Sequence, residues 1–211
     1  MKLKEIELDA LKEIANIGSG NAATSLSTLI EKRVRMSVTS TYLVAIEQAA
    51  EALGGAERSV SAIYLRISGS ISGSFLLVFS PADADRLAFS ILGRGSEKAV
   101  RREELAQSAL KELSNVYAGT YFTALSQMMG LRFFYSVPEI ATDMLQAVLD
   151  GILIELASDV EHVLVLDTIF EVDREKVRAH TLFLPDPQGL AVILNALHLH
   201  GERKGRKVVG G

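Results

Sequence analysis

The chain has 211 residues, which is enough for one domain of ordinary size. Hydrophobic residues make up 48% of it, and 22 Lys and Arg against 26 Asp and Glu give a formal net charge of −4. A mildly acidic chain is poorly suited to binding a phosphate backbone, so we expect no nucleic-acid partner. The absence of cysteine excludes disulfides, thiolate catalysis and thiolate metal ligands. We expect no metal or cofactor of the chain's own.

The N-terminal residues are charged and lack the apolar segment of a signal peptide. The longest uncharged stretch, 113–131, is long enough to span a membrane but contains several polar side chains, which are costly in hydrocarbon. We therefore expect a cytoplasmic protein with no membrane insertion, and we expect it to be a monomer.

The first predicted element is a long helix over 8–30, and this helix recurs 99 residues later. Nine of the 21 positions from Ala10 to Ile30 are identical in the second copy. Such self-similarity indicates a duplicated unit. We interpret residues 1–200 as one domain made of two repeats, about 5–95 and 101–198, followed by a basic tail over 201–211.

Each repeat is expected to continue from its long helix into strands and then a shorter helix. Three β-branched runs predict strands over 34–46, 59–68 and 70–80, with a turn at 69–73. Pro81 then ends a strand and begins a helix, and Pro185 does the same in the second repeat. Between the repeats we expect a charged connector over 94–102. The second repeat is predicted to contain strands over 163–173 and 177–184.

These elements predict an α/β (α+β) fold. Two units that each expose the edge of a half-sheet can hide both edges by pairing. We expect a central sheet with pseudo-twofold symmetry and two long helices related by that axis.

Each long helix has two contrasting faces. At 100° per residue, the apolar positions of the first helix form a stripe that we expect to be buried. These positions are Leu8, Leu11, Ala15, Gly18, Ala22, Leu26 and Leu29. The opposite face carries Asp9, Glu13, Asn16 and Gly20, and the second helix repeats it with Ser108, Glu112, Asn115 and Gly119.

The outward faces have an unusual composition. Asn is a mediocre residue inside a helix, and Gly costs about 1 kcal/mol there relative to Ala. An isolated Glu-x-x-Asn on a helix is usually only a solvated surface. Here, however, the outward Glu, Asn and Gly are identical in both repeats, whereas the inward Ala15, Gly18 and Ala22 become Ser114, Tyr117 and Tyr121. That contrast favours selection for a binding or catalytic surface.

The outward residues also limit the chemistry. An amide carries both donors and an acceptor, so it can fix a water molecule in space. Orienting a water for attack on a phosphoryl group is a known role of amides in phosphoryl transfer. The neighbouring carboxylate can then pair with a cation on a substrate protein.

The pattern Asp9-x-x-x-Glu13-x-x-Asn16, with its echo Ser108-x-x-x-Glu112-x-x-Asn115, resembles the CheC family of chemotaxis phosphatases, which includes CheX and FliY. The resemblance extends from residue 5 to about 198. It implies hydrolysis of the aspartyl phosphate of a CheY-type response regulator. It also implies that Asn16 and Asn115 orient the water, that Glu13 and Glu112 pair with the regulator's lysine, and that the Mg²⁺ is held by the regulator.

One position departs from the family pattern, which has a proline about 23 residues after the Asn. The second repeat has Pro138, but the first has Thr39. Proline fixes φ, so we expect Thr39 to loosen the start of the strand behind the first site and the second site to be the better formed. The resemblance further implies binding of the deamidase CheD through the helix at 140–156, with Asp150 as a possible contact.

Two other functions stay open. A non-enzymatic adaptor that binds CheY or CheD, as a flagellar-switch or receptor-adaptation module, would keep the same surface without turnover. A small-molecule hydrolase is disfavoured because the sequence shows no nucleophile–base pair.

Overall fold

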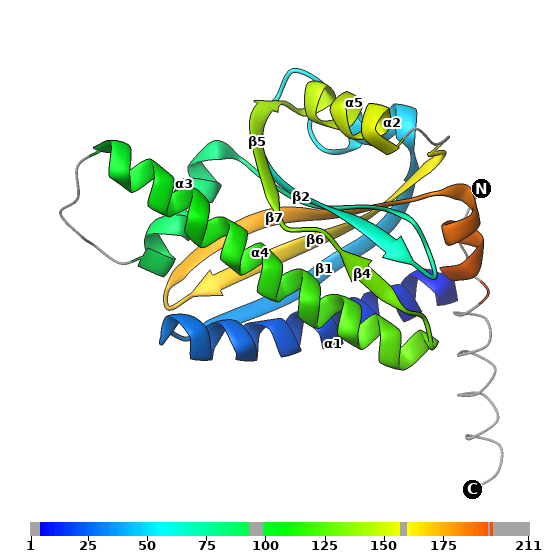
Figure 1. Ribbon diagram of the computed structural model, residues 1–211, viewed down its shortest axis with the longest axis horizontal. Coiled ribbons are helices and arrows are strands. Elements are labelled where there is room, and N and C mark those ends of the chain that lie inside the picture. Colours follow the sequence, from blue (N-terminus) through cyan, green and yellow to red (C-terminus); the bar gives the residue numbers. More distant parts are fainter. Residues whose placement is uncertain (1–4, 93–98, 157–159, 194, 196–211) are drawn as a thin grey trace, which may run out of the picture.

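The structure, a computed structural model, describes residues 5–92, 99–156, 160–193 and 195 (Figure 1). The helices are α1 (Glu5–Ile30), α2 (Ile46–Ala52), α3 (Pro81–Leu92), α4 (Ala99–Met129) and α5 (Leu145–Leu156). The strands are β1 (Val34–Ala45), β2 (Ser59–Gly69), β3 (Gly73–Phe79), β4 (Phe133–Tyr135), β5 (Glu139–Met144), β6 (His162–Val172) and β7 (Glu175–Pro185). A further helical segment covers 187–193.

Within these residues the strands form one antiparallel sheet in the order β1-β6-β7-β3-β2-β4, with β5 also paired to β2. The repeat predicted from the sequence sets its layout. Ile30 and Met129, the last residues of α1 and α4, are 99 residues apart, and so are Val34 and Phe133, the first residues of β1 and β4. The pseudo-twofold α/β (α+β) fold with two long related helices is confirmed.

The two repeats exchange a strand. β1 of the first repeat pairs with β6 of the second, and β5 of the second pairs with β2 of the first. Both pairings end in the same way: Ala45 lies opposite His162, the first residue of β6, and Met144, 99 residues after Ala45, lies opposite Ser59, the first residue of β2. β3 and β7 join the halves in the middle of the sheet. Each repeat therefore completes the sheet of the other.

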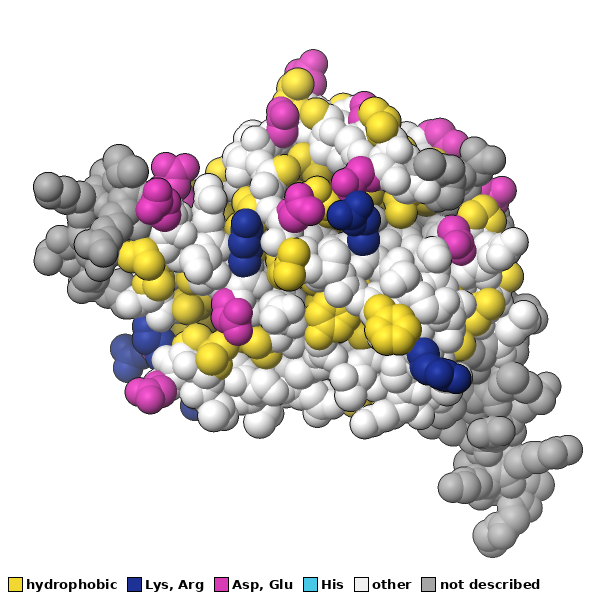
Figure 2. All heavy atoms as spheres, in the orientation of Figure 1, with side chains coloured by type: hydrophobic (Ala, Val, Ile, Leu, Met, Phe, Trp, Pro, Cys, Tyr) yellow, Lys and Arg dark blue, Asp and Glu magenta, His cyan; other side chains and the backbone are white. Residues whose placement is uncertain are grey.

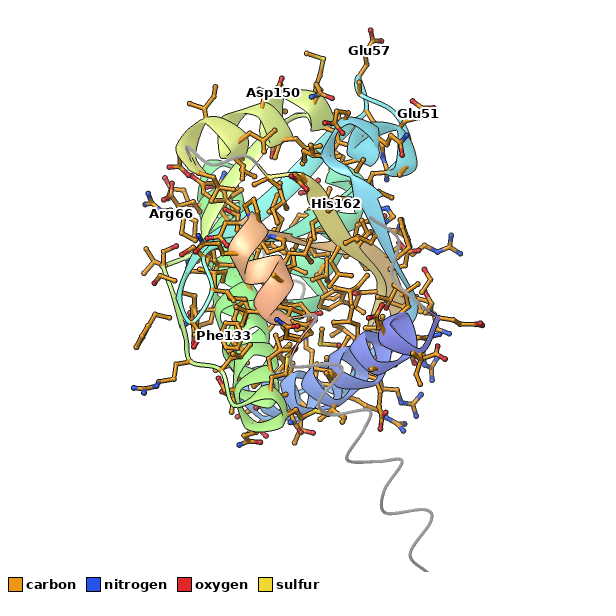
Figure 3. All side chains as sticks on the ribbon, turned by 90° about the vertical axis from the view of Figure 1, so that its right-hand side faces the viewer. Glu51, Glu57, Arg66, Phe133, Asp150 and His162 are labelled. Atoms are coloured by element: carbon orange, nitrogen blue, oxygen red, sulfur yellow. The ribbon has the colours of Figure 1, made fainter. Side chains whose placement is uncertain are left out.

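The helices lie in two layers. α1 and α4 lie side by side on one face of the sheet, and α2 and α5 cover part of the other, as Figure 3 shows from the side. A separate apolar core fills each interface. The layer of α1 and α4 thus carries both predicted functional faces on its outer side.

Small residues on α1 accept large residues of α4. A Cβ added to Gly18 would lie 2.9 Å from Cδ2 of Tyr121 and 3.1 Å from its Cα, so only glycine fits at this contact. Tyr121 also packs against Phe75, with ring centroids 5.5 Å apart. Burial raises the pKa of Tyr121, and it raises that of Tyr117, whose hydroxyl lies 3.3 Å from Thr181 Oγ1.

Three sequence-based expectations about the helices are wrong. Leu29 is 51% exposed, because the last turn of α1 borders an open groove. Residues 140–144 belong to β5 and not to a helix, because the edge of β2 pairs with them. Residues 99–102 are the first turn of α4 and not part of a connector. The rest of that connector, 94–98, and the tail over 201–211 lie outside the described residues.

Candidate functional site

The outward face of α1 is where the sequence predicted it. Asp9, Glu13, Asn16 and Gly20 are all exposed, and they follow one another at intervals of about one helical turn. Gly20 has open space around the position of a Cβ, with nothing within 4 Å among the described residues. A partner can therefore approach the α1 backbone closely at this point.

A backbone group holds the Asn16 amide. The N–H of Val38, on β1, donates a hydrogen bond to Asn16 Oδ1 over 2.9 Å. An N–H can only donate, so the amide oxygen must face β1 and Nδ2 must face away from it. Asn16 Oδ1 retains a second lone pair, and no described residue takes either Nδ2 hydrogen, so both can bond a ligand or a water.

The strand behind Asn16 is continuous but contains a β-bulge. Val38 pairs with Thr168 and Ser40 with Asp167, so Thr39 is the extra residue. Thr39 Oγ1 donates to the backbone carbonyl of Asp167 over 3.1 Å. The expectation that Thr39 loosens this strand is wrong, because the bulge accommodates it and its hydroxyl ties it to β6.

The outward face of α4 repeats the same residues. Ser108, Glu112 and Asn115 are exposed, and Gly119 is half-buried. Ser108 and Glu112 lie on the wall of a groove of about 250 Å³. The rest of that wall is largely apolar and includes Leu29, Leu92 and Leu105, each more than a third exposed.

The end of the α4 face differs from that of α1. Tyr135, on β4, lies over Gly119, and a Cβ there would be 2.7 Å from its hydroxyl oxygen. Gly119 therefore makes room for a side chain of the same protein and not for open approach as at Gly20. Figure 2 shows hydrophobic side chains reaching the surface alongside α4, and Phe134 and Tyr135 are 64% and 39% exposed.

The strand behind Asn115 is broken. Pro138 lies between β4 and β5, whereas its equivalent Thr39 lies inside β1. Val137 is 78% exposed, whereas its equivalent Val38 is 4% exposed. Within the described part of the chain, the Asn115 amide makes no hydrogen bond. The amide fixed in advance is that of the first site and not that of the second.

Sequence reasoning missed two groups at these sites. One is the N–H of Val38, because a backbone donor leaves no residue-type signal. The other is the Tyr135 side chain. Extending the 99-residue shift beyond the helices aligns Tyr135 with Met36, and this alignment could have placed Tyr135 on the strand that follows α4. The structure keeps the two Glu–Asn pairs on separate helices, so the outward faces form two sites and not one.

The α5 region forms a third surface, on the far side of the sheet from α1 and α4. Asp150 is exposed there and accepts a hydrogen bond from Gln146 Nε2 over 2.8 Å (Figure 3). A groove of about 330 Å³ beside it is lined by Val148, Gly151 and Ile152 among others. Ile154 is 79% exposed.

The described residues include no cluster of three or more His, Cys, Asp or Glu side chains that could hold a metal ion. Nor do they include a helix that is both long enough and apolar enough to cross a bilayer.

Comparison with known proteins gives a consistent result. The CheC-like family model matches residues 6–38, which cover α1 and the first residues of β1. The chain is 32% identical over 199 residues to the CheY-P phosphatase CheC of Bacillus subtilis, covering 92% of this chain and 95% of that protein. It is 30% identical over 141 residues to the flagellar motor switch phosphatase FliY of the same organism, covering 65% of this chain and 36% of that protein.

Among solved structures, FliY of Thermotoga maritima superposes with a TM-score of 0.73 at 19% identity, covering 95% of this chain and all of that one. This likeness shows a shared fold. Together with the identity to CheC along nearly the whole length of both proteins, it establishes that the chain belongs to the CheC family.

Proposed function

We propose that the chain is a phosphatase that hydrolyses the aspartyl phosphate of a CheY-type response regulator. The observation that carries the proposal is the exposed Glu–Asn pair, present at equivalent positions on α1 and α4. The names of the relatives, CheY-P phosphatase CheC and flagellar motor switch phosphatase FliY, support the same reaction. The proposed substrate implies a protein of the cytoplasm, and we expect it to act as a monomer.

In the proposed reaction the Asn side chain enters the regulator's active site and orients a water in line with the acyl phosphate. The water oxygen bonds to phosphorus, and the bond between phosphorus and the aspartyl oxygen breaks. The carboxylate leaves on the regulator, and the water protons remain with the inorganic phosphate. The Mg²⁺ that neutralises the phosphoryl charge belongs to the regulator substrate.

The carboxylate one turn before each Asn has a separate role in this proposal. Glu13 and Glu112 pair with a lysine of the regulator and set the depth and orientation at which the helix enters. Positioning of this kind can supply a large part of the rate enhancement, since the amide then meets the water in one geometry.

The test is dephosphorylation of a regulator charged with a small acyl phosphate, measured with wild type and with the double variant Asn16→Ala and Asn115→Ala. We expect the stimulated rate of the double variant to be at least about 100-fold lower than that of wild type, which is the size of effect seen when one catalytic donor is removed. Asn21→Ala is a matched control, because Asn21 is exposed on α1 about 140° around the helix from Asn16. A double variant as fast as wild type would rule out the mechanism.

The α5 surface supports a second candidate function, binding of CheD. An exposed Ile154, an exposed Asp150 and the groove beside them suit a partner with an apolar contact surface. Ile154→Asp and Asp150→Arg should weaken CheD binding in a titration while leaving regulator dephosphorylation without CheD unchanged. If the chain binds the regulator and CheD but never accelerates phosphate release, it is an adaptor and not an enzyme.

A further inference from the structure

We propose that the backbone N–H of Val38 is a positioning group for Asn16, and that it makes the two sites unequal. The first site holds its amide in one orientation before the regulator arrives, whereas the second must order its amide on binding. This inference rests on the proposed phosphatase function and adds a residue to its machinery.

The position of β1 in the sheet explains why this N–H is available. Among the described strands β1 lies at one end of the sheet and pairs only with β6. Along an edge strand, N–H groups on the unpaired side have no strand partner and must find water or a side chain. Val38 is 4% exposed, and its N–H finds Asn16 Oδ1 at 2.9 Å.

The bulge at Thr39 fixes the direction of that N–H. A bulge changes the local twist of a strand and re-aims the groups beside it. The Thr39 hydroxyl bonds the Asp167 carbonyl over 3.1 Å, and pairing resumes at Ser40. The strand therefore passes the bulge without breaking, and Val38 stays packed beside α1.

The hydrogen bond selects one of two amide orientations. A flip of Asn16 would turn Nδ2, a donor, toward the Val38 donor and lose the bond. Nδ2 is therefore held away from β1 before any partner binds. A group ordered in advance loses less freedom on binding, and that difference appears in the rate of the step it assists.

The second repeat shows what happens without this arrangement. Pro138 interrupts the equivalent strand, Val137 is exposed, and Asn115 makes no hydrogen bond within the described part of the chain. The two sites therefore share their residue types but differ in the order of the amide.

Hydrogen exchange tests the contact independently of activity. In the full-length wild type we expect the Val38 amide to be protected by at least about tenfold relative to Asn16→Ala. Asn16→Asp should retain the protection, because a carboxylate also accepts, and Asn21→Ala should leave it unchanged. A Val38 amide that exchanges equally fast in wild type and Asn16→Ala would overturn the inference, whatever the phosphatase activity.

Kinetics test the consequence in a protein with only the first site, Asn115→Ala. Adding Thr39→Pro places at this position the proline that interrupts the equivalent strand of the second repeat. We expect kcat on the phosphorylated regulator to fall about fivefold while KM stays within about twofold. Thr39→Ser keeps the hydroxyl and should retain the full rate. If Thr39→Pro unfolds the protein, Thr39→Val serves instead: it removes only the tie to Asp167 and should give a smaller fall in kcat.

A kcat for Thr39→Pro or for Thr39→Val equal to that of the parent Asn115→Ala protein would overturn the inference. An Asn115→Ala protein with no activity above the regulator's own hydrolysis would instead contradict the proposed function of the first site. The exchange experiment keeps these two failures apart.

Discussion

The two long helices of this protein agree on their outer faces and differ on their inner ones. Outside, α1 and α4 both present Glu and Asn one turn apart. Inside, Gly18 of α1 lies against Tyr121 of α4, and no other residue fits there without movement. At this contact a small residue of one helix packs against a large residue of the other, which does not require equivalent positions to be identical.

A pseudo-twofold interface requires complementary and not identical residues, so packing alone accounts for the divergence of the inner positions. The identity of the outer faces still needs an explanation, since packing does not demand it. A surface that meets the same kind of partner twice supplies that explanation.

The largest expected effect tests the inner face against the outer one. Gly18→Ala should lower the free energy of unfolding by about 2 kcal/mol, because its Cβ would meet the Tyr121 backbone. Gly20→Ala should instead raise stability by about 0.5–1 kcal/mol through helix propensity, because its Cβ meets nothing within 4 Å. Urea unfolding of both variants measures the difference, and equal values would mean that the helices do not cross at Gly18.

Gly119→Ala sharpens the same experiment. Its Cβ would lie 2.7 Å from the Tyr135 hydroxyl oxygen, so Tyr135 must move before the helix can gain stability. We expect a smaller gain than for Gly20→Ala. A gain as large as that of Gly20→Ala would show that Tyr135 does not lie over the helix.

The next effect separates the two sites in turnover. Asn16→Ala should lower kcat on the phosphorylated regulator about fivefold to tenfold, and Asn115→Ala by no more than about twofold, because only Asn16 is fixed in advance. Initial rates at saturating phosphorylated regulator measure kcat for both variants. The reverse ranking would mean that a fixed amide is no advantage in this reaction.

A smaller effect concerns docking at the second site. In the Asn16→Ala background, Glu112→Lys should raise KM for the regulator about fivefold, because its charge would repel the regulator's lysine. Glu13→Lys in the same background is the matched control and should change KM by less than about twofold. The effect should shrink at high salt, since added ions screen an exposed pair. An unchanged KM for Glu112→Lys would remove the docking role of that carboxylate.

The last effect tests the burial of two α4 tyrosines by raising the pH. Burial raises the folded-state pKa of Tyr117 and of Tyr121 above the value of about 10 in the unfolded chain. Stability is therefore fully present below about pH 10 and falls as the pH rises further, by up to about 1.4 kcal/mol per pH unit for each tyrosine. Tyr121→Phe should flatten this fall in urea unfolding between pH 9 and 11. An identical fall in stability in wild type and Tyr121→Phe would show that burial does not raise the pKa of Tyr121.

The sequence alone determined the duplication, the two long helices and the outward positions of Glu13, Asn16, Glu112 and Asn115. These features depend on local periodicity and on identity at one shift of 99 residues, and both can be read from a single chain. The apolar runs also predicted most of the strands correctly, because alternation and turn residues are local signals.

Only the tertiary structure decided which strand completes which half-sheet, why residues 140–144 are a strand, and which of the two asparagines is held. Each of these depends on a partner elsewhere in the chain: β6 for β1, β2 for β5, and the N–H of Val38 for Asn16. Backbone hydrogen bonds across a sheet follow the path of the whole chain and not the identity of the residues that make them.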